Sequence, residues 1–432
     1  MAENSVGLLN QLLSKEEDEI KLELVQKATS KALKALTLFI ILIAFAIGIF
    51  LAPLIALKEI FGITENVFQG PFLVDLVIIS VASVLAFVFP KLKNNESSYS
   101  ELSQLLHRLA LNNYVLQIKL FQREKRKFGQ TPERNEFLII SGLARAGTTS
   151  MLNDLMESNA FASLNYSNMP FLLCPNTWKK LYNPQKGENK ERSHKDGIYI
   201  GLGSNEALEE YFFKAHLKDN YIRNEGLFEH EISEEVHDEY LEYQSVVRNS
   251  SDKIYLAKNN NFILRYRSIR KLNKEFKMVI MLREPLLHAS SLLEKHVQYA
   301  KMQEEDPFVL EYMDWLGHHE FGKGVKPFVL GSNKDISANG SLNSIDHWLK
   351  VWVNYYSFVN SLDENGMVLI DYEKYCEDPN STLKKVLGLV QLEDSLHEKK
   401  RFINQRKNIE GYSNELYGKA RSIYDTLLSK AS

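Results

Sequence analysis

Hydrophobic and polar positions divide this chain into two parts. Residues 35–57 contain no charged side chain, and a second apolar run, 68–90, contains one acid, Asp75. Each run is long enough to cross a bilayer as a helix. The pattern therefore predicts an N-terminal hairpin of two transmembrane helices over 34–90. A buried helical hairpin in a soluble core is the alternative, and Asp75 favours it because an acid is costly at mid-bilayer.

Two amphipathic stretches flank the predicted hairpin. Over 8–27 and 100–127, leucines and other apolar residues recur at helical spacing among charged residues. We assign 1–33 to an amphipathic N-terminal segment and 91–134 to an amphipathic helical linker. The linker is expected to pack against the folded domain that follows, 135–432, and a position on the bilayer surface is the alternative.

The distribution of Lys and Arg predicts an orientation for the hairpin. Basic residues are frequent before the first apolar run and after the second, whereas the link between the runs has Lys58 alone. The positive-inside rule then places both termini on the same side of the bilayer. In a bacterium this predicts a multi-pass protein of the inner membrane, with its folded domain on the cytoplasmic side.

An apolar run at 137–140 leads into a glycine loop and then a helix-like segment. Strand, loop and helix in this order present backbone N–H groups and a helix N-terminus to one point, a geometry that binds phosphate. Gly142 and Gly147 have the spacing of a Walker A loop, but Thr148 stands where the Lys of that motif should be. Arg145 is the only cation inside the loop. The loop is thus expected to hold a phosphate without being built like an ATPase.

The pattern Gly-x-x-Arg-x-Gly-Thr-Thr resembles the 5′-phosphosulfate loop of the sulfotransferases that use 3′-phosphoadenosine 5′-phosphosulfate (PAPS). A second element of this family also has a counterpart here. The strand-like run 277–282 ends at Arg283, Glu284 and Pro285, and Ser291 follows about two helical turns later. This arrangement resembles the family's strand and Arg-Asp-Pro element with its downstream Ser, which together bind the 3′-phosphate. Glu replaces Asp in this chain.

Two further segments resemble the family in the same order. Lys258 follows a strand-like run, as does the Lys-containing segment of many bacterial and protein-tyrosine sulfotransferases. Further on, 367–373 resembles the family's late strand with its Tyr-Glu end, and Pro379 comes soon after. The resemblance covers roughly 135–390. It implies a three-layer α/β P-loop-type domain with a central, mostly parallel sheet.

The resemblance also implies an activity and a set of site residues. The expected reaction is in-line transfer of a sulfuryl group from PAPS to a hydroxyl of a glycan or lipid-linked acceptor. Positioned cations lower the barrier because the leaving bisphosphate gains negative charge, and Arg145 and Lys258 are the catalytic candidates. Arg283 and Ser291 would bind the 3′-phosphate. The residues expected to contact the donor are Arg145, Ala146, Gly147, Thr148, Thr149, Ser150, Arg283 and Ser291.

A hydroxyl acceptor usually needs a general base, and here the resemblance says less. Related enzymes often place a Glu or His shortly after the phosphate-loop helix, but no acid lies in 161–175. We choose His194 as the catalytic base, because an ordinary His pKa suits proton transfer near neutral pH and a neighbouring carboxylate could orient the ring. His319 and Glu206 are the alternatives.

Composition narrows the possible partners. The chain has 432 residues and a net charge of −3, and this near-neutral balance argues against binding to nucleic acid. Its two cysteines, Cys174 and Cys376, do not make a disulfide framework, and no Cys/His set has zinc-ligand spacing. We therefore expect no catalytic metal. The predicted membrane hairpin favours a glycan or lipid acceptor close to the membrane. A homo-oligomer stays open.

Two other classes of protein also stay open. A membrane-anchored nucleotide-dependent kinase or NTPase would share the phosphate loop, but it would lack the Walker Lys. A non-catalytic membrane scaffold on a degenerate P-loop fold would have no need of the whole set of phosphate-binding residues named above. Preference among nucleotides would separate both classes from a sulfotransferase.

Overall fold

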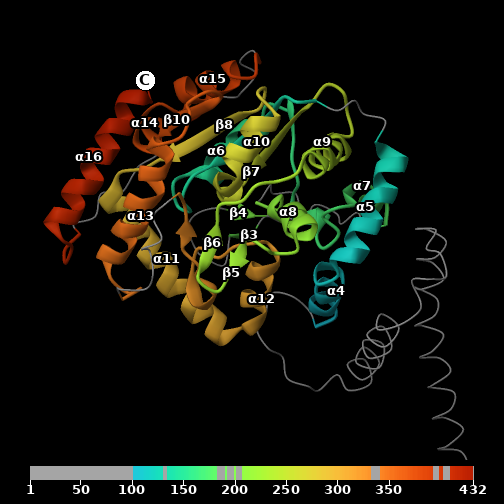
Figure 1. Ribbon diagram of the computed structural model, residues 1–432, viewed down its shortest axis with the longest axis horizontal. Coiled ribbons are helices and arrows are strands. Elements are labelled where there is room, and N and C mark those ends of the chain that lie inside the picture. Colours follow the sequence, from blue (N-terminus) through green and yellow to red (C-terminus); the bar gives the residue numbers. More distant parts are fainter. Residues whose placement is uncertain are drawn as a thin grey trace, which may run out of the picture. The chain divides into compact units, whose positions relative to one another are not determined.

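A five-stranded parallel sheet forms the centre of the folded domain, with helices on either side of it (Figure 1). The strand order is β10–β8–β1–β7–β2, and each neighbouring pair is parallel. The prediction of an α/β fold with a central parallel sheet is confirmed. The strands are β1 (Phe137–Ser141), β2 (Phe161–Ala162), β7 (Ile254–Lys258), β8 (Lys277–Leu282) and β10 (Met367–Asp371).

The computed structural model describes residues 101–129, 134–181, 190–191, 199–200, 207–331, 341–392, 398–401 and 409–431. The α-helices in these ranges are α4 (Glu101–Leu111), α5 (Tyr114–Phe128), α6 (Thr148–Met156), α7 (Pro175–Leu181), α8 (Glu210–Leu217), α9 (Glu234–Arg248), α10 (Tyr266–Leu272), α11 (Pro285–Glu305), α12 (Pro307–Trp315), α13 (Ile345–Asn360), α14 (Tyr372–Glu377), α15 (Pro379–Gly388) and α16 (Asn414–Lys430). The 3-10 helices are η2 (Tyr166–Asn168), η3 (Asn260–Arg265) and η4 (Gly322–Gly324). Short strands form two small sheets, β3 (Lys190–Glu191) with β4 (Tyr199–Ile200), and β5 (Ile222–Arg223), β6 (Gly226–Phe228) and β9 (Phe328–Val329).

Both faces of the main sheet are covered, which gives the domain three layers. Alternate residues of a strand point to opposite faces, and every residue of β1 is buried. Leu138 and Ile140 pack in one apolar cluster with side chains of α6 and α15. Phe137 and Ile139 pack in a second, larger cluster with side chains of α9, α10 and α13. This double coverage explains why the strands read as continuous apolar runs.

The predicted linker helix over 100–127 consists of two helices, α4 and α5. The chain breaks between them because the Asn113 side chain accepts a hydrogen bond from the backbone N–H of Leu116 at 2.9 Å and so starts α5. Asn is a favourable N-cap, since its side-chain oxygen satisfies a donor of the first turn. Leu111 and Phe121 belong to the larger apolar cluster. The two helices therefore pack against the domain, as expected.

The structure does not support the predicted membrane localisation. Across the ranges given above, no helix is both long and apolar enough to cross a bilayer. The 21-residue helix α11, for example, carries Glu294, Lys295 and Lys301. The prediction of a multi-pass inner-membrane protein is corrected accordingly. The segments on which it depended, 1–33 and 34–90, lie outside the described residues.

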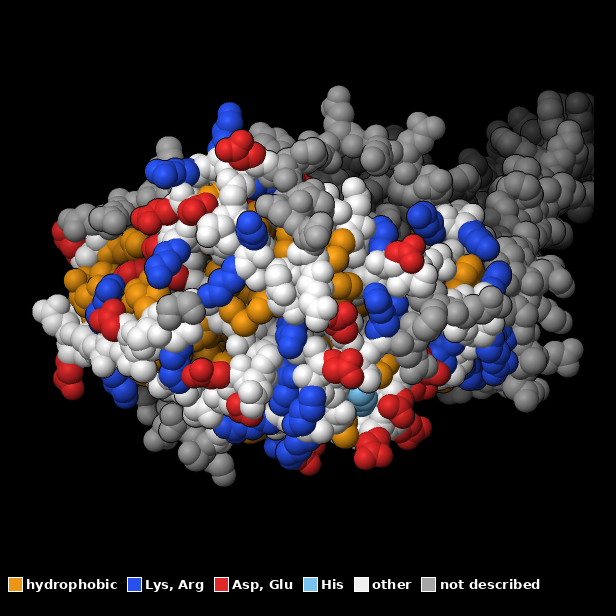
Figure 2. Space-filling view, turned by 90° about the horizontal axis from the view of Figure 1, so that it is seen from above, with side chains coloured by type: hydrophobic (Ala, Val, Ile, Leu, Met, Phe, Trp, Pro, Cys, Tyr) orange, Lys and Arg blue, Asp and Glu red, His pale blue; other side chains and the backbone are white. Residues whose placement is uncertain are grey.

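Charge is spread over the face of the molecule that Figure 2 shows. Lys and Arg side chains lie among Asp and Glu side chains, and apolar side chains are visible between them. This distribution agrees with the near-neutral net charge of −3.

Candidate active site

Four segments that the sequence analysis identified meet at one edge of the main sheet. The phosphate loop (142–147) follows β1, Lys258 ends β7, Arg283 follows β8 and Tyr372 follows β10. These strands are parallel and adjacent, and their register keeps the carboxyl ends level. Open α/β sheets bind their ligands at this edge. The fold thus brings residues from across the domain to one place.

Two glycines determine the shape of the phosphate loop. Gly142 has a φ of 143° and Gly147 a φ of 91°, both in the region that residues with a side chain rarely adopt. A Cβ on Gly142 would lie 2.9 Å from the carbonyl oxygen of Met281, and one on Gly147 would overlap the ring of Tyr372. The loop backbone therefore passes too close to its neighbours for a side chain at either point.

The first turn of α6 faces the same edge. Gly147 is the N-cap residue and has no side chain that could cap the helix, while Thr148, Thr149 and Ser150 form the first turn. Backbone N–H groups of a first turn have no partner inside the helix and carry the positive end of its dipole. The N–H of Ala146 is different, because it donates to the Leu143 carbonyl oxygen at 3.2 Å within the loop. An oxyanion fits at such a helix start.

Arg145 links the phosphate loop to the second predicted element. Its Nε donates a hydrogen bond to the Ser291 hydroxyl at 3.4 Å. In the other direction, Arg283 Nη1 donates to the Arg145 carbonyl oxygen at 2.8 Å. Arg145 itself has a φ of 71°, an uncommon value for a residue with a side chain. The residues expected at the 5′-phosphate and at the 3′-phosphate therefore contact one another directly.

A neutral histidine forms a hydrogen bond to the backbone of the phosphate loop. His288 is fully buried, and burial together with the charge of Arg283 lowers its pKa to about 3. Its Nε2 donates to the Ala144 carbonyl oxygen at 2.8 Å. The imidazole thus anchors the loop without adding a charge beside the two arginines.

The backbone and side chain of Arg283 are both fixed by neighbours. The guanidinium lies 4.9 Å from the ring centroid of Tyr372, and Trp352 Nε1 donates to the Arg283 carbonyl oxygen at 3.2 Å. The next residue, Glu284, is the N-cap of α11, and its carboxylate accepts from the Leu287 N–H at 2.8 Å. Glu therefore serves as a helix cap where the family has Asp.

A carboxyl group close to Arg283 titrates near neutral pH. Glu373 accepts hydrogen bonds from the backbone N–H of Glu284 at 3.2 Å and from the Tyr424 hydroxyl at 3.1 Å. Burial, together with the hydrogen bond and charge of Asp371, raises the pKa of Glu373 to about 7. The Tyr-Glu end of the late strand thus supports the start of α11 and changes charge beside the site.

Lys258 is the last residue of β7 and is only 8% exposed. The three asparagines that follow it donate side-chain hydrogen bonds to two other segments of the chain, the start of α8 and the loop between α12 and η4. These bonds fix the wall of the site next to Lys258. The acceptors are Glu210 for Asn259 (2.9 Å), Glu320 for Asn260 (3.2 Å) and the carbonyl oxygen of Gly317 for Asn261 (2.8 Å).

Glu210 is half of a fully buried ion pair. Its two carboxylate oxygens accept hydrogen bonds of 2.7 Å from the guanidinium of Arg265. Burial alone would raise the pKa of Glu210, but the charge of Arg265 holds it below its usual range. The neighbouring Glu209 has no such partner, and burial raises its pKa to about 8. Two adjacent carboxyl groups behind Asn259 are thus in different charge states at neutral pH.

Sequence reasoning missed one pair beside Lys258. His318 Nδ1 lies 3.4 Å from a carboxylate oxygen of Glu320. Burial would raise the pKa of Glu320, but the charges of His318 and Lys258 lower it to about 2. In the sequence, the spacing of His318 and Glu320, two positions apart, was the signal that could have indicated this pair. The alternative base His319 is 3% exposed, and its Nδ1 donates to the Gly324 carbonyl oxygen at 3.1 Å.

The chosen base, His194, and the alternative Glu206 lie outside the described residues, so their positions stay predictions. In the part of the chain that the structure describes, no group of three or more His, Cys, Asp or Glu side chains is arranged to hold a metal ion.

Comparisons with known proteins give matches among solved structures. No protein-family model matches the chain, and a search of curated proteins finds no match. Sulfotransferase STF1 from Mycobacterium tuberculosis is 12% identical over 87% of this chain and 93% of that chain, with a TM-score of 0.39. Sulfotransferase STF9 from Mycobacterium avium is 12% identical over 82% and 81%, with a TM-score of 0.40. A sulfotransferase from Alicyclobacillus acidocaldarius is 10% identical over 68% and 93%, with a TM-score of 0.31.

The solved structures to which this chain is similar are thus bacterial sulfotransferases. The assignment of a donor, an acceptor and residue roles depends on the residues of the site itself.

Proposed function

We propose that this chain transfers a sulfuryl group from PAPS to a hydroxyl of a glycan or lipid-linked acceptor. The observation that carries the proposal is the direct contact of Arg145 with both Arg283 and Ser291. A nucleotide kinase needs a cation on the polyphosphate chain, and a Walker loop supplies it as Lys. Here two guanidinium groups from different elements stand at the loop. That pattern suits a nucleotide with phosphates at both its 5′ and 3′ positions.

The residues at the sheet edge fit such a ligand. The φ of Gly147 and its close approach to the Tyr372 ring, which leaves no space for a Cβ, fix the backbone at the start of α6. The first turn of α6 supplies N–H donors, and each guanidinium adds a planar set of donors suited to phosphate. When bound there, PAPS would supply the activated sulfuryl group.

Roles follow from position. Arg145 and the N–H groups of 147–150 would hold the 5′-phosphate and the sulfuryl oxygens. Lys258, on the strand next to β1, would offset the negative charge that develops on the bridging oxygen. Arg283 and Ser291 would bind the 3′-phosphate and so set specificity rather than rate.

Two histidines are candidates for the general base. His194 keeps the role that the sequence suggested. Among the described residues, His318 is the second candidate, because Glu320 holds its Nδ1 and leaves Nε2 to take the proton of an acceptor hydroxyl. The charge of Lys258, the proposed catalytic cation, acts on the carboxylate of Glu320, which supports a role for this pair near the proposed reaction.

The proposal is tested by transfer of radiolabelled sulfate from PAPS to panels of glycan and lipid acceptors. Lys258→Ala should lower kcat by about a hundredfold while leaving nucleotide affinity nearly unchanged. Lys271→Ala is the matched control, since Lys271 is 67% exposed and pairs with a surface Glu. No transfer to any hydroxyl acceptor, together with hydrolysis of ATP, would overturn the proposal.

A further inference from the structure

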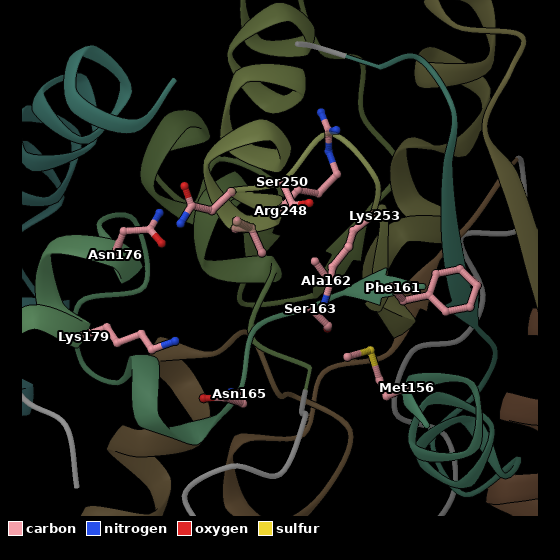
Figure 3. A pocket seen from close by; sticks show the side chains of 12 residues that line it. Met156, Phe161, Ala162, Ser163, Asn165, Asn176, Lys179, Arg248, Ser250 and Lys253 are labelled. Atoms are coloured by element: carbon pink, nitrogen blue, oxygen red, sulfur yellow. The ribbon is translucent and has the colours of Figure 1, made fainter. Parts of the chain in front are cut away.

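A separate pocket lies beside β2, the last strand of the main sheet, and Figure 3 shows it from close by. Its volume is about 490 Å³. The lining residues come from the end of α6, from β2 and the chain after it, from α7, from the end of α9 and from the turn before β7. No residue of the phosphate loop contributes. The pocket is therefore distinct from the proposed active site.

Positive charge dominates the lining of this pocket. Lys179, Arg248 and Lys253 contribute to it, and none of the lining residues is Asp or Glu. Figure 3 shows the side chains of Lys179 and Lys253 extending into the pocket from different sides. Each of the three cations comes from a different element, so their proximity is a property of the fold rather than of a local sequence run.

The two lysines of the pocket, Lys179 and Lys253, have ammonium groups available to a ligand. Within the described residues, the ammonium groups of Lys179 and Lys253 form none of the ion pairs or side-chain hydrogen bonds that other lysines make, such as Lys214 with Asp219 or Lys399 with Asp154.

The pocket also gathers like charges. Arg248 is 4% exposed, and burial together with the charge of Arg134 lowers its pKa. Arg134 reaches this region because its Nη1 donates to the Lys253 carbonyl oxygen at 3.4 Å. A bound anion would lower the electrostatic repulsion among cations gathered in one pocket.

Polar donors complete the lining. Asn165, Asn176 and Ser163 contribute amide and hydroxyl groups, and the Asn176 side chain is fixed by a 2.8 Å hydrogen bond to the Val246 carbonyl oxygen. The volume lies in the range of small-molecule sites. An anion alone would fill little of it, whereas a sugar-sized body would engage the amides and hydroxyls.

We propose that this pocket binds a phosphate or sulfate monoester of a sugar-sized polar molecule. Lys179 and Lys253 contact the ester oxyanion, and the asparagines and Ser163 contact the hydroxyl groups of the body. The proposal is independent of sulfuryl transfer, because it uses none of the residues assigned to the donor.

Isothermal titration calorimetry on the full chain tests this proposal, with glucose 6-phosphate and glucose 6-sulfate as probes and glucose as the neutral control. At least one ester should bind, and raised salt should weaken binding. The ester that binds more tightly identifies the phosphate or the sulfate class. Lys179→Ala/Lys253→Ala should weaken affinity about tenfold or more, since two charge-assisted contacts are lost.

Two control variants separate this pocket from other anion sites. Lys180→Ala removes the adjacent lysine, which lies over the Phe128 ring at 4.8 Å and does not line the pocket, and it should leave affinity unchanged. Arg145→Ala tests the phosphate loop in the same way. Binding of neither ester, equal weakening by Lys180→Ala, or loss in Arg145→Ala alone would each overturn the proposal. If the double variant has a lowered melting temperature, Lys179→Gln is used alone, because Lys179 is exposed and its substitution should not affect folding. This single variant should also weaken binding of the ester.

Discussion

The guanidinium of Arg283 donates a hydrogen bond from Nη1 to the carbonyl oxygen of Arg145 at 2.8 Å. The two residues are 138 positions apart in the chain, at the ends of adjacent strands. The contact means that the residue assigned to the 3′-phosphate also holds the loop assigned to the 5′-phosphate. Substitution of Arg283 should therefore weaken binding of both the 3′-phosphate and the 5′-phosphate of a nucleotide.

Gly147→Ala tests the close approach of the loop to Tyr372. The substitution forces a φ of 91° on a residue with a side chain and places its Cβ in the tyrosine ring. We expect a loss of about 2 kcal/mol or more in the free energy of unfolding, and loss of nucleotide binding. Chemical denaturation and calorimetry measure the two effects.

Gly418→Ala is the control for that substitution. Gly418 lies inside α16, and a Cβ there would meet nothing within 4 Å. Alanine should stabilise the helix by about 0.5–1 kcal/mol. If both variants changed stability alike, the proposed close approach at Gly147 would not exist.

The buried pair Glu210–Arg265 should contribute to stability chiefly through the cost of breaking it. Glu210→Gln leaves the fully buried guanidinium without a counter-charge, and we expect a loss of about 3–5 kcal/mol. Glu231→Gln removes an exposed pair with Lys271 and should cause no measurable change. Urea denaturation compares the two, and similar losses would show that burial of the first pair is unimportant.

His288 predicts a loss of stability in acid. Its pKa is about 3 in the folded chain, whereas an ordinary His has a pKa near 6.5, so the unfolded chain binds a proton more readily between these values. Its contribution is therefore fully present above about pH 6.5 and falls as the pH drops towards 3.

His288→Gln keeps an N–H donor but does not titrate. Between pH 7 and pH 5 the wild-type chain should lose on the order of 2 kcal/mol more than this variant. Denaturation curves at both pH values give the difference. Parallel losses in the two chains would show that His288 is not held neutral beneath the loop.

Under the proposed function, one of two histidines is the general base. His318→Ala should lower kcat by about a hundredfold or more if the His318–Glu320 pair acts, and Glu320→Gln should lower it less. His194→Ala should then leave kcat nearly unchanged, and the reverse pattern would assign the base to His194. Near-normal turnover in both variants would reject both assignments.

The strands at the site edge were predictable because their own residues specify them. The run 277–282 was expected as a strand and coincides with β8, since a strand buried on both faces must be apolar throughout. The loop glycines, Gly142 and Gly147, were also predictable, because the tight turn between strand and helix needs backbone angles that glycine adopts. The split between α4 and α5 was missed, although Asn113 is a favourable cap, because the apolar spacing continues across it.

The wall of the site could not be read from the sequence. The partners of Asn259, Asn260 and Asn261 lie 49, 60 and 56 positions away, and a side-chain amide carries no mark of what it will contact. Likewise, nothing in the sequence distinguishes Glu210 from an ordinary acid on a helix, and its partner Arg265 is 55 positions away. Tertiary packing determines which side chains become partners.

Under the proposed function, the phosphate loop and Arg283 together recognise a nucleotide that carries phosphate at both its 5′ and its 3′ position. Calorimetry compares the binding of 3′-phosphoadenosine 5′-phosphate, ADP and ATP to the full chain. We expect the 3′-phosphorylated nucleotide to bind about tenfold or more tightly than the others, and this preference to be lost in Arg283→Ala. Equal or tighter binding of ATP would reject recognition of the 3′-phosphate and favour a kinase or NTPase.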